Sequence, residues 1–410
     1  MRRVGIISLL AAMFVMAFLQ SSRAQIPTHF GATRAPALAV DKSDKVYLTM
    51  SVATKPASAM TPGSQIFFTL SSDGGNNWNN LPFTKNLSKS KGEAFGSAIA
   101  INQQGTTRAY VVYHDDTQGA SQAYLVSTKK KAKFKKAQNI TPIGAAAFSP
   151  RIALDSSEAL NVVWGDTETG NRRVIFTRST DLGATFSESR DISQSEGAAF
   201  EPEICVDQTD AINVVWEDTA AGNSAIMFAR SVDNGLTFSA PLAISDPTRR
   251  AIEAHIAVDR GNGIHVIWTD EVEEDSQIFY ARSTDGGQGF SAPVNISNDE
   301  GRQARKPYIT TFGNTIYIAY HTERTTRKQV FLHRSTDGGA SFEDREQVSR
   351  ADNSRGRAHS VAMAADSTGK LHLAWIDTSP VHNDEGVLFY CSTRNGHSFT
   401  QSQIIFAALP

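Results

Sequence analysis

Cysteine is scarce in this sequence: Cys205 and Cys391 are the only two among 410 residues. The repeat described below places them in different units, on opposite sides of a closed ring. We therefore expect two buried, free thiols and no disulfide. The chain also has no paired-cysteine metal spacing, no Walker loop, no dinucleotide fingerprint and no Gly-x-Ser-x-Gly elbow. The sequence predicts neither a metal centre nor a cofactor.

Long apolar runs are absent except at the N-terminus. Residues 4–19 are almost wholly apolar and follow the basic start Met1-Arg2-Arg3, while Ser22-Arg23-Ala24 supplies small residues before a cleavage point. This arrangement is typical of a secretory signal peptide, residues 1–24, cleaved after Ala24. It predicts a secreted or periplasmic protein of residues 25–410 with no stable membrane insertion. The alternative is a membrane anchor that stays in place.

An excess of positive charge is absent as well. The chain has 40 Lys and Arg against 42 Asp and Glu, a net charge of −2. Such a balance gives no general attraction to nucleic acid, so no nucleic-acid partner is expected. Hydrophobic residues make up 40% of the chain, which is enough for a large core.

One pattern, Ser-x-Asp-x-Gly-x-x-aromatic, recurs along the whole chain. Five copies are intact, whereas the copies at 127–134 and 392–399 have lost the Asp. The copies start at Ser71, Ser127, Ser179, Ser231, Ser283, Ser335 and Ser392. Because four consecutive steps are 52 residues each, the chain consists of seven copies of one structural unit.

Each unit carries the signals of four short strands. In the fifth unit, β-branched and aromatic runs at 255–259, 264–268, 277–282 and 293–297 are separated by Gly and Asn turns. Four antiparallel strands repeated at a fixed period are typical of β-propeller blades. We predict an all-β fold, a single seven-bladed β-propeller of four-stranded antiparallel blades.

The repeated turn resembles the Asp-box, or BNR repeat, of the sialidase superfamily, and the resemblance covers nearly all of residues 30–405. It implies that the turns are structural, with the Asp accepting N–H groups of its own turn. Sialidases typically have six blades, so six is the alternative to seven. Because all first strands run the same way, the turns that enter them and the loops that leave the second strands share the face opposite these turns. We expect a ligand at that face, at the mouth of the central channel.

One ring of positions there is polar in four consecutive units. The second residue of the first strand is Ala37, Ala98, Arg151, Glu203, His255, Tyr308 and Ser360. Convergent polar side chains at a channel mouth predict a binding site. The alternative is a solvated channel lining with no ligand.

A second ring, three residues earlier, predicts a cluster of arginines. It reads Arg34, Phe95, Phe148, Phe200, Ile252, Arg305 and Arg357. Closure of the ring would place Arg34, Arg305 and Arg357 side by side, facing an apolar arc. Guanidinium groups bind carboxylates with paired hydrogen bonds, so we predict a clamp for an acidic sugar. The alternative is that these arginines form surface ion pairs.

The family resemblance implies roles for several of these residues. Arg34-Ala35-Pro36 is similar to the sialidase Arg-Ile-Pro motif, whose arginine contacts the sialic acid carboxylate. Sialidases use a tyrosine nucleophile with a glutamate partner, and we assign these roles to Tyr308 and Glu203, with Glu201 and Glu253 as alternatives. Lys306 and Arg305 are expected to lower the pKa of Tyr308. Arg151 and His255 are expected to contact substrate.

One departure from the family opposes hydrolysis. Residues 52–70, where sialidases have their acid/base aspartate, contain no Asp and no Glu; Asp115 or Asp116 would have to substitute. The sequence therefore leaves three hypotheses. The protein is an exo-glycosidase acting on acidic sugars, a non-catalytic propeller that binds a carbohydrate or a protein partner, or a lyase or other hydrolase using the channel mouth differently.

Overall fold

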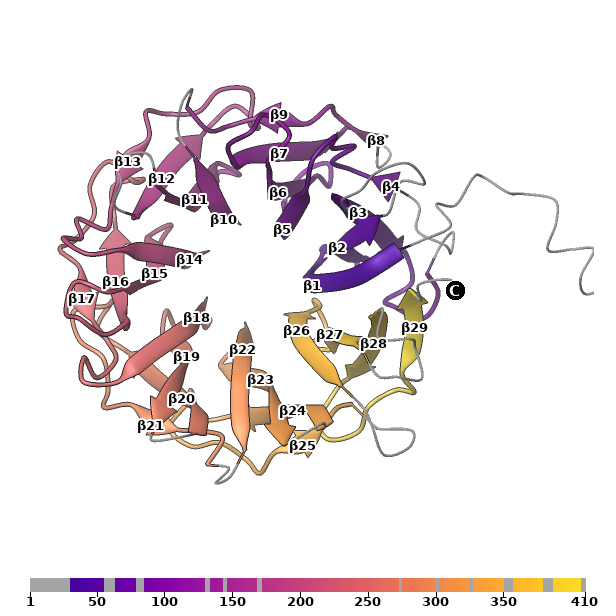
Figure 1. The fold of residues 1–410 in the computed structure, drawn as a ribbon. Coiled ribbons are helices and arrows are strands. Elements are labelled where there is room, and N and C mark those ends of the chain that lie inside the picture. The colour runs from indigo at the N-terminus through magenta and orange to yellow at the C-terminus, as the bar shows by residue number, and fades with distance from the viewer. Residues whose placement is uncertain are drawn as a thin grey trace, which may run out of the picture.

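The protein is a seven-bladed β-propeller (Figure 1). The computed structural model describes residues 30–54, 63–78, 85–129, 133–142, 146–167, 172–272, 275–298, 302–324, 327–349, 357–378 and 386–406. The predicted signal peptide lies outside them. Seven sheets of sequentially paired strands surround a central axis, each with its first strand innermost (Figure 1). Seven blades are confirmed, and the six-bladed alternative is excluded.

The first four blades contain the following strands. Blade 1 has β1 (Phe30–Val40), β2 (Val46–Thr54), β3 (Gly63–Ser71) and β4 (Lys85–Asn86); blade 2 has β5 (Ala94–Ile101), β6 (Ala109–Asp115), β7 (Gln122–Lys129), β8 (Lys133–Phe134) and β9 (Gln138–Asn139). Blade 3 has β10 (Ala147–Leu154), β11 (Leu160–Asp166), β12 (Arg173–Ser179) and β13 (Arg190–Asp191); blade 4 has β14 (Ala199–Val206), β15 (Ile212–Asp218), β16 (Ala225–Ser231) and β17 (Leu242–Ala243).

The last three blades repeat this plan. Blade 5 has β18 (Arg250–Val258), β19 (Ile264–Val272), β20 (Asp275–Ser283) and β21 (Val294–Asn295); blade 6 has β22 (Gln303–Phe312), β23 (Thr315–Arg324), β24 (Arg327–Ser335) and β25 (Glu346–Gln347). Blade 7 has β26 (Ala358–Ala365), β27 (Leu371–Asp377), β28 (Val387–Thr393) and β29 (Gln403–Phe406). Neighbouring strands pair antiparallel throughout.

The repeated turn after each third strand is held by its own side chains. In blade 3, Asp181 Oδ1 accepts the Thr185 N–H at 2.9 Å and the Ser179 hydroxyl at 2.8 Å. The Ser179 Oγ in turn accepts the Gly183 N–H at 2.9 Å. Gly183 has a φ of +80°, which favours glycine. The turn is therefore a structural element, as its repetition predicted.

The aromatic residue of each turn joins two blades. Phe238 packs edge-on against Phe176 of the preceding blade, with ring centroids 5.1 Å apart. Phe290 and Phe228 repeat this contact at the same distance. In the worn second copy, Phe134 keeps the contact with Phe68 of blade 1 at 4.8 Å. Seven hydrophobic clusters result, one at each interface between blades.

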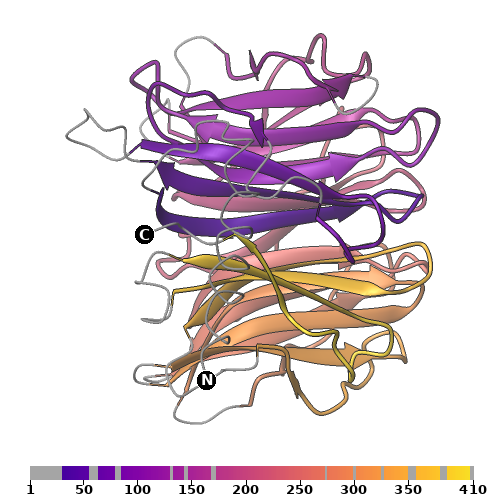
Figure 2. The ribbon, with the colours of Figure 1, turned by 90° about the vertical axis from the view of Figure 1, so that its right-hand side faces the viewer.

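The ring closes by side-chain packing, because every blade consists of consecutive strands. Blade 1 (indigo) lies beside blade 7 (yellow) in both views (Figures 1 and 2). Trp78 of blade 1 packs on Tyr390 of blade 7 at 5.0 Å. Lys370 donates to the Gly74 carbonyl at 2.7 Å across the same seam. Closure therefore depends on the turn of blade 1 as well as on the apolar cluster.

Two further expectations concern the cysteines and the membrane. Cys205 and Cys391 are both free and lie in different blades, as predicted. Burial raises the pKa of both thiols. Among the residues that the structure describes, no helix has the length and apolarity needed to span a membrane.

Candidate functional site

A cavity of about 790 Å³ occupies the mouth of the central channel. It lies where first strands begin and second strands end, the face that the sequence predicted for a ligand. Its volume falls within the range of roughly 300–1,000 Å³ usual for ligand sites. All seven blades contribute residues to its wall, so the cavity is built by the ring as a whole.

The same irregularity shapes every first strand at this mouth. A β-bulge separates Arg34 from Ala37 in blade 1, and bulges at equivalent positions occur in the other six blades. In blade 7 the bulge separates His359 from Ala362. The predicted register of that blade was therefore wrong by two residues. Ala362 takes the place of Ser360 in the polar ring, and His359 takes the place of Arg357 in the ring that contains the arginines.

The corrected ring explains the shape of the cavity. Blades 1 and 2 place the small residues Ala37 and Ala98 at this position, and both line the cavity. In blade 7, Ala362 is fully buried, and Ser360 and Val361 line the cavity instead. Blades 3 to 6 place large polar side chains there, and all four line the cavity: Arg151, Glu203, His255 and Tyr308. The site is therefore one-sided, with polar groups facing an open space.

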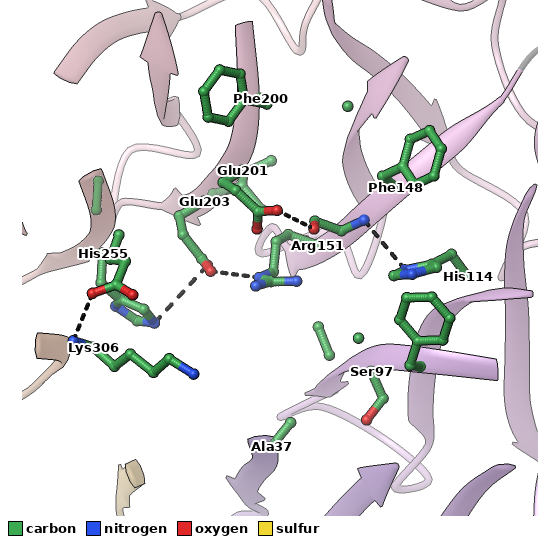
Figure 3. A pocket seen from close by; sticks show the side chains of 18 of the residues that line it. Ala37, Ser97, His114, Phe148, Arg151, Phe200, Glu201, Glu203, His255 and Lys306 are labelled. Carbon is green, nitrogen blue, oxygen red and sulfur yellow. Dashed lines mark hydrogen bonds and ion pairs between the residues drawn. The ribbon is translucent and has the colours of Figure 1, made fainter. Parts of the chain in front are cut away.

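These four side chains lie next to one another in blade order, and Figure 3 shows the first three, Arg151, Glu203 and His255. Arg151 Nε donates to Glu203 Oε1 at 2.5 Å. His255 Nε2 lies 3.9 Å from Glu203 Oε2, and its ring lies 4.0 Å from that of Tyr308, centroid to centroid. The sequence prediction that these residues form one cluster agrees with this geometry.

Burial sets the protonation states of the cluster. It lowers the pKa of His255, against the opposing effect of Glu203. It raises the pKa of Tyr308, and the Glu203 carboxylate raises it further, while Arg151 acts in the opposite direction. At neutral pH, His255 is a neutral imidazole and Tyr308 a neutral phenol. The expected lowering of the Tyr308 pKa by Arg305 and Lys306 does not occur.

A set of contacts between blades holds the bulges in place. Glu217 Oε1 accepts the Glu253 N–H at 2.7 Å, and Glu253 Oε2 accepts the Lys306 N–H at 2.8 Å. Glu253 and Lys306 have φ values of +58° and +50°, a conformation that non-glycine residues adopt at a cost. Because His255 and Tyr308 follow two residues later, these hydrogen bonds position the cluster. Burial raises the pKa of Glu217 to about 7.

The predicted arginine clamp is not assembled among the described residues. Arg305 Nη2 lies 3.8 Å from Glu271 Oε1 and 3.5 Å from Gln303 Oε1, outside the cavity. Arg357 occupies the position equivalent to Gln303, because of the register difference in blade 7, and its N–H donates to Asp377 at 3.2 Å. Neither side chain lines the cavity.

Arg34 has a known backbone position, but its side chain lies outside the described residues. It pairs with Ser51 at the start of the blade 1 bulge. A proline follows two residues after the bulge begins in blades 1, 3, 4 and 6, at Pro36, Pro150, Pro202 and Pro307. Arg34-Ala35-Pro36 is thus the first-blade copy of a repeated bulge. Its similarity to the sialidase motif is therefore not specific to blade 1.

Other lining residues were not assigned to the binding site from the sequence, and Lys306 was named only for its charge beside Tyr308. The exposed side chains of Lys306 and Arg172 belong to the cavity wall, and Lys306 extends into the open space (Figure 3). Glu217 and His114 occupy equivalent positions near the ends of their second strands. In blades 1 to 7 this position reads Ser51, His114, Gly165, Glu217, Thr269, His321 and Ile376. Within the described residues, no three His, Cys, Asp or Glu side chains are grouped as metal ligands.

No protein-family model and no curated protein sequence matches this chain. Solved structures do share its fold. An ulvan lyase from a new family of polysaccharide lyases, bound to a GlcA–Rha3S segment, matches with a TM-score of 0.64 at 10% identity, covering 92% of this chain and 97% of the lyase. An intramolecular trans-sialidase from Ruminococcus gnavus matches with a TM-score of 0.51 at 12% identity, covering 93% and 98%. A protein of unknown function from Dyadobacter fermentans matches with a TM-score of 0.53 at 14% identity, covering 86% and 92%.

These similarities establish the fold. The chain has a propeller fold that is also seen in a sialidase, an intramolecular trans-sialidase and a polysaccharide lyase.

Proposed function

We propose that the protein cleaves an acidic, uronate-containing polysaccharide by β-elimination at the channel mouth. The observation that carries this proposal is the cluster of Arg151, His255 and Tyr308, an arginine beside two neutral proton-transfer groups in one cavity. The similarity to an ulvan lyase over nearly the whole of both chains supports it at the level of the fold.

The reaction requires a base, an acid and a cation, and each has a candidate. The neutral His255 imidazole takes the proton from the carbon next to the uronate carboxylate. The freed electron pair forms a carbon–carbon double bond, the bond to the leaving glycosidic oxygen breaks, and the Tyr308 hydroxyl gives its proton to that oxygen. Transfer of the proton from His255 to the tyrosinate restores both groups.

Arg151 stabilises the charge that develops on the carboxylate. Its Nε is used by Glu203 and one Nη1 donor by the Pro150 carbonyl at 3.2 Å, which leaves the Nη2 donors for a substrate. Lys306 extends into the same space and supplies a second cation (Figure 3). Glu203 positions the side chains of Arg151 and His255 through its carboxylate.

A second candidate is the sialidase-type hydrolysis of an acidic sugar, with Tyr308 as nucleophile and Glu203 as its base. The closeness of the Glu203 carboxylate to the Tyr308 hydroxyl, evident from their electrostatic interaction, favours it. Two observations weigh against it: the pKa of Tyr308 is raised rather than lowered, and Arg305 and Arg357 lie outside the cavity. The non-catalytic binding propeller is the outcome if neither reaction occurs.

The test is an assay of the purified protein on ulvan, alginate, polygalacturonate and chondroitin. Elimination produces an unsaturated sugar that absorbs ultraviolet light, whereas hydrolysis produces reducing ends without this absorbance. A sialic acid glycoside with a fluorescent leaving group tests the second candidate in parallel. We expect ultraviolet absorbance with at least one polysaccharide, and its loss by about 100-fold or more in Tyr308→Phe and in His255→Ala.

Release of sugars that lack the double bond would show that the protein hydrolyses its substrate and would contradict elimination. Binding of a polysaccharide with no release would leave a non-catalytic propeller. Arg305→Ala is the matched control, because it removes a guanidinium from the same strand as Tyr308 without touching the cavity.

A further inference from the structure

Three phenylalanines form a row along the rim of the cavity. Phe95, Phe148 and Phe200 occupy the position at which the bulge begins in blades 2, 3 and 4, and all three line the cavity. The equivalent residues in the next two blades are Ile252 and Arg305. The aromatic row is therefore confined to one arc of the ring, next to the polar cluster.

Two of the three rings are linked through a histidine, and the third carries a cation. Phe95 packs edge-on against His114, with centroids 3.9 Å apart, and His114 lies 6.1 Å from Phe148 on its other side. At the far end, the Arg172 guanidinium lies 5.6 Å from the centre of the Phe200 ring. The row thus ends in an exposed cation.

Phe148 is unusual in its exposure. It is 39% exposed, and of the exposed large apolar side chains among the described residues, it alone lines the cavity. Its exposure has a local cause, since the residue paired with it on the neighbouring strand is Gly165. In blades 2 and 4 the same position holds His114 and Glu217. No side chain therefore covers Phe148 from β11.

We propose that this aromatic row binds the sugars that flank the one in the polar cluster, so that the ligand is an internal segment of an acidic polysaccharide. This inference rests on the proposed function and specifies its substrate as a polymer attacked along its length. Apolar faces of sugar rings pack on aromatic rings, and an aromatic pocket wall with few polar groups is the usual form of a carbohydrate-sized site.

The position of the row identifies its occupant. Phe148 and Phe200 each precede a member of the polar cluster, Arg151 and Glu203, by three residues on the same strand. A sugar held by the cluster must continue over these rings if its chain extends toward blades 3 and 4. Arg172 then lies where the acidic group of a neighbouring sugar would pass. The cluster and the row are two parts of one cavity.

The test measures affinity as a function of chain length. Disaccharides and hexasaccharides of ulvan and of polygalacturonate are titrated calorimetrically against the Tyr308→Phe protein, so that turnover does not interfere. Phe148→Ala and Phe200→Ala are added to that background. We expect each to weaken hexasaccharide binding by about tenfold while changing disaccharide binding less than about twofold. Phe148→Trp should restore hexasaccharide binding.

Phe312→Ala is the control, because Phe312 is also 39% exposed but does not line the cavity. Equal effects on short and long ligands, or no effect, would overturn the inference. Tight length-dependent binding without cleavage by the wild-type protein would support the row and refute the proposed lyase. Cleavage without length dependence would support the lyase and refute the row. Binding of no acidic oligosaccharide at all would overturn both.

Discussion

Glu217→Gln should stabilise the protein at neutral and alkaline pH. Glu217 is 4% exposed, and burial, aided by the nearby Glu201 and Glu253 charges and opposed by the Glu253 N–H, raises its pKa from 4.5 to about 7. A difference of about 2.5 pKa units corresponds to about 3 kcal/mol. Ionised Glu217 therefore lowers the free energy of unfolding by about 3 kcal/mol relative to the protonated form.

The sign follows from proton linkage. Because the pKa in the folded state exceeds that in the unfolded state, the folded protein binds the proton more tightly, and its stabilising effect is complete below the unfolded value. It is lost as the pH rises from 4.5 to about 7. The amide of Gln cannot ionise, yet its oxygen still accepts the Glu253 N–H. The variant should therefore match the wild type near pH 4 and exceed it by about 3 kcal/mol near pH 8.

The assay is urea unfolding followed by tryptophan fluorescence across this pH range. The wild-type free energy of unfolding should fall with pH more steeply than that of Glu217→Gln. Glu188→Gln, which removes an exposed carboxylate, controls for the change in net charge. Parallel pH dependences of wild type and Glu217→Gln would refute the assignment of a buried, neutral carboxyl at this position.

Four other variants have defined outcomes. Gly75→Ala should lower the free energy of unfolding by more than about 2 kcal/mol, because its Cβ would lie 1.7 Å from the Tyr390 hydroxyl at a φ of +82°. Gly74→Ala, with nothing nearer than 3.9 Å, should cost about 1 kcal/mol in the same unfolding experiment. Arg151→Lys should keep a charge beside Glu203 yet reduce turnover by about 100-fold, since the planar donor set is lost; equal turnover would exclude carboxylate binding there. Arg305→Ala should leave turnover within about twofold, and a larger loss in steady-state kinetics would restore a role for the rim arginine.

The repeat made most of the fold predictable. Spacing of the turns predicted seven blades, and the structure shows that the aromatic residues of these turns pack between blades. The predicted ring was correct in blades 1 to 6, including the four polar positions of blades 3 to 6. Blade 7 follows a longer step, so its register was misplaced by two residues. A fully buried alanine precedes the bulge in blades 2 to 7, at Ala94, Ala147, Ala199, Ala251, Ala304 and Ala358, and it would have given the register.

The orientation of side chains was less predictable than their position. Arg305 turns away from the channel because Glu271, on the hairpin of the preceding blade, lies within reach. The role of Glu217 depends on a backbone N–H contributed by another blade. Such contacts join residues 34 or more positions apart and have no signature in the repeat itself. The aromatic row was visible as an apolar arc, but the absence of a side chain at Gly165, which exposes Phe148, became apparent only from strand pairing.

The most direct test of the proposed activity is the mass of the products formed from a purified uronate oligosaccharide. Elimination divides the substrate without adding water, so the summed mass of the two products should equal that of the substrate, and one product should be unsaturated. Loss of both products in Tyr308→Phe would connect the reaction to the cluster. Products whose summed mass exceeds that of the substrate by one water molecule would contradict the account and assign hydrolysis to this site.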